Sequence, residues 1–500
     1  MDIAYYSEAI KTAIKKGEPV EYSFGYIDKE EAEFIIEVLG VILQELNKTY
    51  LMEEISYVLR EFVTNANKSN LKRVYFNFLS LDIHNPENYR KGMETFAKDL
   101  HDKLSVLNKD FQKYSLYTKV AFQVKGNVLK IEIRNSNCTV PQEKDRILGF
   151  LKQAKRIRDI AEAYQNLADT TEGTGLGLIS SMLMLRSMGL DEDACKFIMD
   201  EQKNETVVSL DVFLDTVTEM QLDFISDLIL SEIKTLPVFP EQVQKLQKMI
   251  SDEDVAFSKV AEVIQSDVAL TAELLRIVNS AQYMLPQKVS NITNAISLIG
   301  IKGLKALLYS YGTQNVLTRK YGRMEQIWQH AYQVASYAYH LAREILKRTE
   351  LQDDAYIGGI LHDMGKIIIT QAYPGLMEKI NNHCMDKGIN GNMIERLALG
   401  ISHAKIGAEI ARHWNFPDNV VDVISYHHKP LLSPDESKDI VHIVYLANIL
   451  AHMKDENFYF SLVEKEVLKK FNIKTKKELI ALGQTLDKYY QEQIKKASLI

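Results

Sequence analysis

The segment GILHDMGKI, residues 359–367, contains the feature from which the architecture of the second half of this 500-residue chain follows. It places a histidine and an aspartate side by side within an apolar pattern of helical spacing. Further histidines lie on helical segments on either side, at His330, at His403 and at the adjacent pair His427 and His428. Imidazole and carboxylate groups suit borderline divalent metals, and adjacent pairs from different helices can converge on a binuclear site. The pattern therefore predicts a metal centre inside a helical domain.

The composition is that of an ordinary globular chain, with 46% hydrophobic and 25% charged residues, so two or three domains can each bury a core. A net charge of -7 argues against a nucleic-acid partner, because a phosphate backbone requires clustered Lys and Arg. The three cysteines are widely spaced and form no CxxC, which excludes a disulfide framework. The start of the chain lacks the apolar core of a signal peptide, and no apolar run reaches the roughly 20 residues of a membrane span. We expect a cytoplasmic protein without membrane insertion.

Hydrophobic periodicity divides the chain into two parts. Residues 1–215 mix helical patterns with alternating stretches, and two of the latter predict hairpins that turn at Gly126-Asn127 and near Lys203-Asn204. We expect an α+β module there, followed by a connecting helix at 216–236 that can transmit a shift between the two parts.

The rest of the chain, residues 237–500, shows helical spacing throughout and is expected to be all-α. Thr475 and Glu478 form one of the predicted capping boxes that separate its helices. The chain is thus expected to be a multi-domain protein.

Three segments of the second half, at 236–250, 263–283 and 292–308, closely resemble the HDOD family, an output-domain branch of the HD superfamily. The matching positions are Leu236, Pro237, Pro240, Asp267, Leu274, Leu275, Asn279, Ser280, Ala295 and Gly300. From the residues themselves, Asp267 is expected to cap a helix N-terminus, the leucines to be core, and Asn279-Ser280 to end a helix. These positions indicate the family and its fold, whereas any chemistry lies further along the chain.

Between His330 and Asn448 the sequence looks closer to the HD-GYP phosphodiesterases. The resemblance implies terminal metal ligands at His330, His362, His403, His427 and His428, with Asp363 bridging two metals and Lys366 facing the scissile phosphate. The implied cofactor is a divalent metal, Fe or Mn in preference to Zn. Such a pair of ions would lie about 3.5–4 Å apart and activate a water molecule for attack on a phosphoester.

The same region departs from the HD-GYP pattern in three places. Asn448 stands where the superfamily has its last acidic ligand, HHKPLL follows the histidine pair in place of a GYP element, and Gln326 replaces the carboxylate of three-metal enzymes. With one carboxylate against two cations, we expect the second metal to be held weakly. The alternative interpretation is that these histidines are inherited core residues. The histidines that match no ligand position are expected at the surface or in packing: His340, His383, His413, His442 and His452.

Two segments of the first half resemble the Bergerat or GHKL-type ATP-binding fold, which implies a sandwich of a mixed sheet and helices. LREFVTNANKS, residues 59–69, looks like the N box, in which Asn65 would hold Mg²⁺ and Glu61 would assist as a general base. TEGTGLGLISSMLML, residues 171–185, looks like the glycine-rich box that cradles phosphates at a helix start, with glycines at Gly173, Gly175 and Gly177. ATP and Mg²⁺ are therefore candidate cofactors of this module.

The remaining features of the module limit that resemblance. The adenine-binding box is represented only by Asn135, Ser136 and Asn137, without the expected Asp and glycines. Residues 1–83 contain no histidine, which argues against a histidine kinase that phosphorylates itself. Lys68 and Lys72 are expected on a solvated helix face.

Three hypotheses follow for the function. In the leading one the protein is regulatory, and a nucleotide or a protein partner bound to the GHKL-like module biases the metal-binding HDOD output domain. In the second it is an active metal-dependent phosphohydrolase whose substrate, by resemblance to HD-GYP enzymes, is a cyclic dinucleotide. In the third it is a Ser/Thr kinase of an anti-sigma-like partner-switching circuit. Signalling proteins are the expected partners, and a homodimer is compatible with all three.

Overall fold

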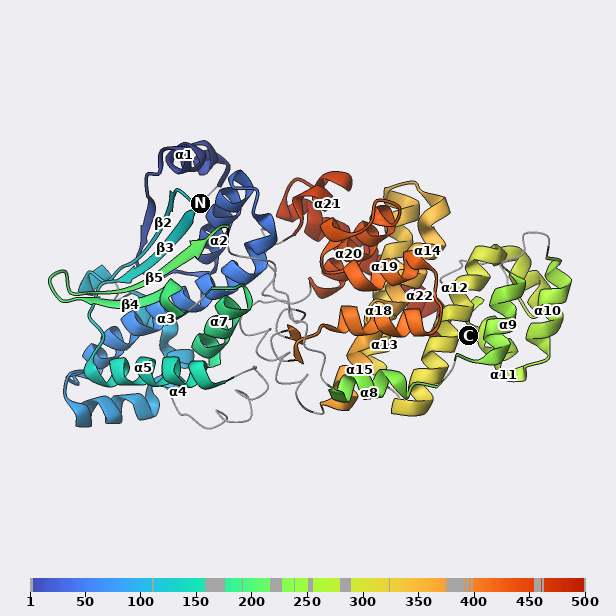
Figure 1. Ribbon diagram of the computed structural model, residues 1–500, viewed down its shortest axis with the longest axis horizontal. Helices are drawn as coiled ribbons and strands as arrows, with labels where there is room; N and C mark the ends of the chain where they lie inside the picture. The colour runs from blue at the N-terminus through green and yellow to red at the C-terminus, as the bar shows by residue number, and fades with distance from the viewer. Residues whose placement is uncertain are drawn as a thin grey trace. The chain divides into compact units, whose positions relative to one another are not determined.

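The structure is a computed structural model that divides into two compact units (Figure 1). One unit is Met1–Phe224 with Arg396–Gly400, and the other is Ile225–Glu395 with Ile401–Ile500. The described residues are 3–109, 112–157, 176–190, 192–215, 227–237, 239–250, 255–278, 289–322, 324–373, 375, 392, 395–396, 399–453, 460 and 463–498. Each unit has its own secondary-structure class and is considered separately.

The first unit is built on a five-stranded sheet with the strand order β1-β2-β3-β5-β4. Its strands are β1 (Val20–Phe24), β2 (Thr118–Lys125), β3 (Val128–Asn135), β4 (Cys195–Asp200) and β5 (Glu205–Phe213). In β2 and β3 every second residue is buried, as the alternating sequence predicts for strands with one face on a core. The helical part of the same unit covers this face.

Both predicted hairpins are confirmed, but the expected mixed sheet is wrong for the described residues. β2 and β3 pair across Gly126, whose φ of 56° meets the positive φ of a two-residue turn with glycine first. β4 and β5 pair across residues 201–204, with Asn204 at a φ of 51°. All four described strand pairings are antiparallel, because β1 and β5 join the outer edges of the β2-β3 hairpin in antiparallel register.

Six helices complete the described part of this unit: α1 (Ile3–Lys16), α2 (Lys29–Glu45), α3 (Met52–Phe78), α4 (Pro86–Lys109), α5 (Pro141–Arg156) and α7 (Leu176–Ser187). α3 packs against β2, β3, α4 and α7. A buried ion-pair network joins α3 to α5, because Glu143 accepts from Arg73 at 2.8 Å and from Lys72 at 2.9 Å. The expectation that Lys72 is solvated is therefore wrong: its side chain is 13% exposed and pairs with a carboxylate from a distant helix.

The second unit is entirely helical in its described residues, as the spacing predicts. It begins with α8 (Asp227–Lys234), the described part of the predicted connecting helix. The other helices are α9 (Glu241–Met249), α10 (Phe257–Gln265), α11 (Val268–Val278), α12 (Ile292–Tyr321), α13 (Glu325–His340), α14 (Gln352–Leu361), α15 (Met364–Ala372), α18 (His403–His413), α19 (Asp418–Tyr426), α20 (Lys438–His452), α21 (Lys465–Lys470) and α22 (Lys476–Ser498).

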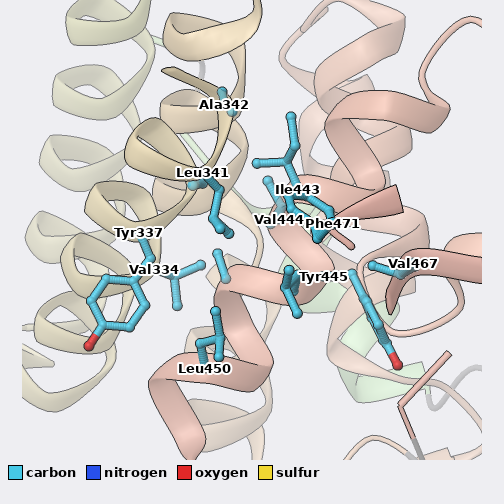
Figure 2. Packing of buried hydrophobic residues seen from close by; sticks show 14 of the residues in the cluster. Val334, Tyr337, Leu341, Ala342, Ile443, Val444, Tyr445, Leu450, Val467 and Phe471 are labelled. Atoms are coloured by element: carbon cyan, nitrogen blue, oxygen red, sulfur yellow. The ribbon is translucent and has the colours of Figure 1, made fainter. Parts of the chain in front are cut away.

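A large hydrophobic cluster holds this unit together (Figure 2). α13 supplies Val334 and Tyr337 to it, Leu341 directly follows α13, and α20 faces them with buried residues such as Val444 and Leu450. Phe471 and Val467 close the cluster from the side of α21. This packing fixes α13 against α20, so the polar side chains on the other faces of the two helices also have fixed positions.

Local signals in the second unit are confirmed where they fall on described residues. Asp267 caps α11, since its Oδ1 accepts from the backbone N–H of Leu270 at 3.0 Å. The backbone N–H of Glu478 donates to Thr475 Oγ1, and that of Thr475 to the Glu478 carboxylate, both at 3.2 Å, as a capping box requires. Gly300 bends α12 with a φ of 70°, whereas Asn279 and Ser280 lie outside the described residues.

No single helix within the described ranges is both long enough and apolar enough to cross a bilayer.

Candidate metal centre

Four helix ends and one helix interior carry the predicted ligands. His330 lies inside α13, and His362 and Asp363 occupy the junction between α14 and α15. His403 is the first residue of α18, and the adjacent pair His427 and His428 directly follows α19. Helix ends suit ligands because the chain can turn there and present neighbouring side chains in different directions.

Gly365 allows the two helix starts of the site to meet. A Cβ atom at this position would lie 2.0 Å from the carbonyl oxygen of His403 and 2.8 Å from the backbone nitrogen of Gly407. Both neighbours are backbone atoms, so only a glycine lets α15 and α18 approach this closely. The contact brings the N-terminus of α18, and with it His403, against Asp363.

The two carboxylate oxygens of Asp363 face two different groups of imidazoles. Its Oδ1 lies 3.2 Å from Nε2 of His403 and 3.8 Å from Nε2 of His427. Its Oδ2 lies 3.4 Å from Nε2 of His362 and 3.6 Å from Nε2 of His330. Asp363 is 2% exposed, so it stands at the buried centre of the cluster, where a carboxylate can bridge two ions.

Two overlapping ligand groups result from this arrangement. Asp363, His403, His427 and His428 form one, and His330, His362 and Asp363 form the other; within each group the ligand atoms lie within 4.8 Å of one another. In the first group, His403 Nε2 lies 3.2 Å from His427 Nε2 and 3.1 Å from His428 Nε2. Three ring nitrogens aimed at one point are the donor set of a transition-metal site.

Asn448, on α20, holds His330 at the edge of the second group. Its Oδ1 lies 3.0 Å from His330 Nε2, the nitrogen that also faces Asp363. The ring of His452, one turn further along α20, lies over the ring of His330 with centroids 4.4 Å apart. The structure thus places Asn448 beside the site as the sequence predicts, and adds His452 as a packing neighbour of His330.

Burial controls the charges of these groups. It holds the pKa of His427 and of His428 well below the usual value, with a further lowering from the neighbouring imidazoles, and it does the same for His330. Burial would raise the pKa of Asp363, but the charges of His362 and Lys366 outweigh it and hold that pKa well below its usual range. His403 differs, because burial would lower its pKa but the neighbouring Glu395 carboxylate outweighs burial and raises that pKa above its usual value. Neutral imidazoles at His330, His427 and His428 and an ionised Asp363 are the protonation states that bind a metal ion.

Two orphaned polar atoms show that the donor set fits a metal. His362 Nε2 and Asp363 Oδ1 are buried and have no hydrogen-bond partner in the described part of the chain. The other ring nitrogen of His362 is satisfied, since it lies 2.7 Å from the carbonyl oxygen of Gly359. Leaving such atoms unpaired costs about 1–3 kcal/mol each, and a bound cation would remove that cost. The interpretation of these histidines as satisfied core residues is less consistent with this observation.

The ammonium group of Lys366 forms an ion pair with the carboxylate of Asp363. Its Nζ lies 2.7 Å from Asp363 Oδ2, and its side chain is 22% exposed. The ammonium group is therefore at the edge of the site and reachable by a ligand, as its predicted role beside a phosphate requires.

Glu395 is a functional candidate that the sequence analysis missed. It is buried, and one of its oxygens lies 2.5 Å from Nδ1 of His403. A single carboxylate in the helical pattern around residue 395 gives no signal of its own, because its separation of eight residues from His403 matches no helical or metal-ligand spacing. Only the fold shows the pairing.

The first unit brings part of the predicted nucleotide site together. Asn65 donates to Glu61 Oε1 at 3.2 Å, and a Cβ atom on Gly177 would lie 2.0 Å from the same oxygen. Ser69, one turn after Asn65 on α3, accepts from Asn135 Nδ2 at 3.4 Å. One face of α3 therefore meets both the start of α7 and the end of β3. The other two predicted glycines, Gly173 and Gly175, lie outside the described residues.

Comparison with known proteins gives a family for the second unit. Residues 236–430 match the family model of the HDOD domain. A protein of Treponema pallidum (strain Nichols), described only as uncharacterized, is 30% identical over 489 residues, which cover 97% of this chain and 94% of that protein. A solved HDOD domain protein of unknown function from Geobacter sulfurreducens is 21% identical. The match covers 56% of this chain and 97% of that protein, with a TM-score of 0.44. A candidate phosphohydrolase from Shewanella amazonensis SB2B is 23% identical. The match covers 55% of this chain and 98% of that protein, with a TM-score of 0.43.

Proposed function

We propose, from the HDOD domain at residues 236–430, that this chain is a signalling protein whose HDOD domain binds divalent metal at the Asp363 cluster. The observation that carries the proposal is the placement of Asp363, whose two buried oxygens face two separate groups of imidazoles. A core that served packing alone would not favour a carboxylate and five imidazoles at one point, because burying them costs more than burying apolar side chains. Fe²⁺ and Mn²⁺ are the ions we expect.

The test is the metal content of the purified full-length protein, prepared under reducing conditions and measured by elemental analysis. We expect at least one Fe or Mn ion per chain, and its loss in His403→Ala. The matched control is His413→Ala, which removes an exposed histidine from the other end of the same helix. Protein that holds no metal in either the wild type or the control, even after incubation with Mn²⁺ or Fe²⁺, would contradict the proposal.

A second candidate function is hydrolysis of a phosphodiester, and Lys366 is the observation that favours it. Its ammonium group beside Asp363 could offset the negative charge that builds on a phosphoryl group, while a bound metal would supply an activated water. The neutral side chain at Asn448 weakens this candidate, since it leaves the second ligand group with a single, shared carboxylate. A cyclic dinucleotide is the substrate class to try first. We therefore rank the regulatory role above the enzymatic one.

We further propose that the first unit binds a nucleotide with Mg²⁺ and acts as the regulatory module. The alignment of Glu61 and Asn65 along one face of α3, with Gly177 packed on Glu61, supports this proposal. Asn65 is exposed, so its side chain is accessible to an ion, and the positive end of the α7 helix dipole favours a phosphate. The experiment is calorimetric titration of the full chain with ATP and Mg²⁺.

A further inference from the structure

We propose that Glu395 is a positioning residue of the metal centre, and that it makes the His403 half of the site the tighter half. The inference rests on the proposed function, because it requires a divalent metal at the Asp363 cluster. It goes further by assigning a role to a residue outside the ligand set, and by ranking the two ligand groups in affinity.

The geometry around Glu395 fixes both the position and the tautomer of His403. One carboxylate oxygen, Oε2, accepts the backbone N–H of His403 at 2.9 Å and lies 2.5 Å from its Nδ1. A carboxylate accepts hydrogen bonds, so the ring must carry its proton on Nδ1. Nε2, 3.2 Å from Asp363 Oδ1, is therefore the ring nitrogen that is left to bind a metal ion. Both residues are 1% exposed, so water does not compete for this contact.

The other imidazoles of the site have neutral partners where the structure gives one. Nδ1 of His362 lies 2.7 Å from the carbonyl oxygen of Gly359, and Nδ1 of His427 lies 2.8 Å from that of Ile424. A carboxylate behind a ligating histidine makes the ring a stronger donor than a carbonyl does, and it adds a negative charge close to the cation. Of His362, His403 and His427, His403 is thus the strongest imidazole donor.

The charges of the two ligand groups are therefore unequal. Two carboxylates supply negative charge to the group of His403, His427 and His428. Asp363 lies next to the ring nitrogens, and Glu395 acts through His403. Within the described ranges, the group of His330 and His362 has a carboxylate only in its share of Asp363, and its neighbour Asn448 is neutral. We infer that a first divalent ion occupies the His403 half and that a second ion binds much more weakly.

The test uses the metal-free full chain, titrated with Mn²⁺ and with Co²⁺ under reducing conditions. Glu395→Gln keeps the shape of the side chain and an acceptor oxygen but removes the charge, and we expect the affinity of the tight site to fall by about 10- to 100-fold. The absorption spectrum of bound Co²⁺ should also change, which a purely structural role would not produce. Glu409→Gln is the control, because it removes the same charge from the exposed side of α18 and should leave the affinity unchanged.

A second pair of variants keeps the inference testable if Glu395→Gln folds poorly. His428→Ala should lose the tightly bound ion, whereas His330→Ala should retain it. The reverse order would overturn the assignment, as would a Glu395→Gln protein that folds and binds the first ion within twofold of the wild type. Wild-type protein that binds no ion contradicts the proposed function itself, so the two failures are distinguishable.

Discussion

Asn448 Oδ1 lies 3.0 Å from Nε2 of His330, the ring nitrogen that also faces Asp363. The amide occupies the place at which a carboxylate would complete the second ligand group. It can support His330 by a hydrogen bond, but it adds no charge. The second ligand group therefore has a neutral amide beside His330 where a carboxylate would supply a negative charge.

Restoring that carboxylate should create a second metal position. In Asn448→Asp we expect Mn²⁺ or Fe²⁺ occupancy to rise toward two ions per chain, with the affinity for the second ion raised roughly tenfold or more, because a hard anionic ligand is added. Metal stoichiometry and turnover of a generic phosphodiester, measured in wild type and variant, check the prediction. A wild type that already binds two ions and turns over substrate would show that our preference for a regulatory role is wrong.

The close approach at Gly365 should be required for both stability and metal binding. Gly365→Ala places a methyl group against two backbone atoms, at 2.0 Å and 2.8 Å, so α15 and α18 must separate. We expect a loss of about 1–3 kcal/mol or more in the free energy of unfolding, together with loss of the metal. The two tryptophans, Trp328 and Trp414, lie in this unit and report its unfolding in urea.

Gly149→Ala is the matched control for that experiment. Gly149 lies inside α5 of the first unit and a Cβ atom there would meet nothing within 4 Å, so the substitution should leave the metal content and the unfolding reported by the two tryptophans unchanged. If Gly365→Ala behaves in the same way and keeps its metal, the helix contact is not what positions His403.

The ion pair between Arg73 and Glu143 should make the first unit sensitive to acid. Burial raises the pKa of Glu143, but Arg73 and then Lys72 outweigh it and lower that pKa from 4.5 to about 2. Because the folded pKa is the lower one, the stabilisation is fully present above pH 4.5 and is lost as the pH falls toward 2. Burial lowers the pKa of Lys72 despite Glu143, so we assign the pairing chiefly to the guanidinium.

Glu143→Gln should therefore destabilise the first unit by about 3–5 kcal/mol at neutral pH, since Arg73 remains buried without its charge partner. The acid sensitivity between pH 4.5 and 2 should decrease in the same variant. Hydrogen exchange of the amides in β2 and β3 measures this unit alone, because both tryptophans are elsewhere. Glu8→Gln, at an exposed pair, should change stability by less than about 1 kcal/mol. Equal effects of the two variants would contradict the assignment.

Binding of ATP with Mg²⁺ should depend on the exposed face of α3. We expect a calorimetric signal with the wild type and a loss of at least about tenfold in affinity in Asn65→Ala, because the amide oxygen would hold the ion. Asn77→Ala is the control, since it changes an exposed asparagine at the far end of the same helix. If the wild type gives no heat and no chemical-shift change, the module is a scaffold without a nucleotide.

The sequence by itself determined the division into an α+β part and a helical part, because side-chain periodicity reflects which face of each element is buried. It also indicated the family of the helical part and, through that resemblance, the histidines and the aspartate that gather there. The turn at Gly126 and the cap at Asp267 were equally local, and such features depend on a few neighbouring residues.

The tertiary structure alone decided which groups act together. Nothing in the chain order shows that Glu395 supports His403, that Gly365 lets α15 and α18 touch, or that Arg73 and Lys72 are drawn inward by Glu143. It also decided the antiparallel sheet, because the pairing of β3 with β5 joins residues 71 to 85 positions apart, from Asn135 with Thr206 to Val128 with Phe213, without a local signal. The physical reason is the same in each case: these contacts depend on burial and packing between distant segments, and burial changes charge, tautomer and distance in ways that spacing along the chain does not encode.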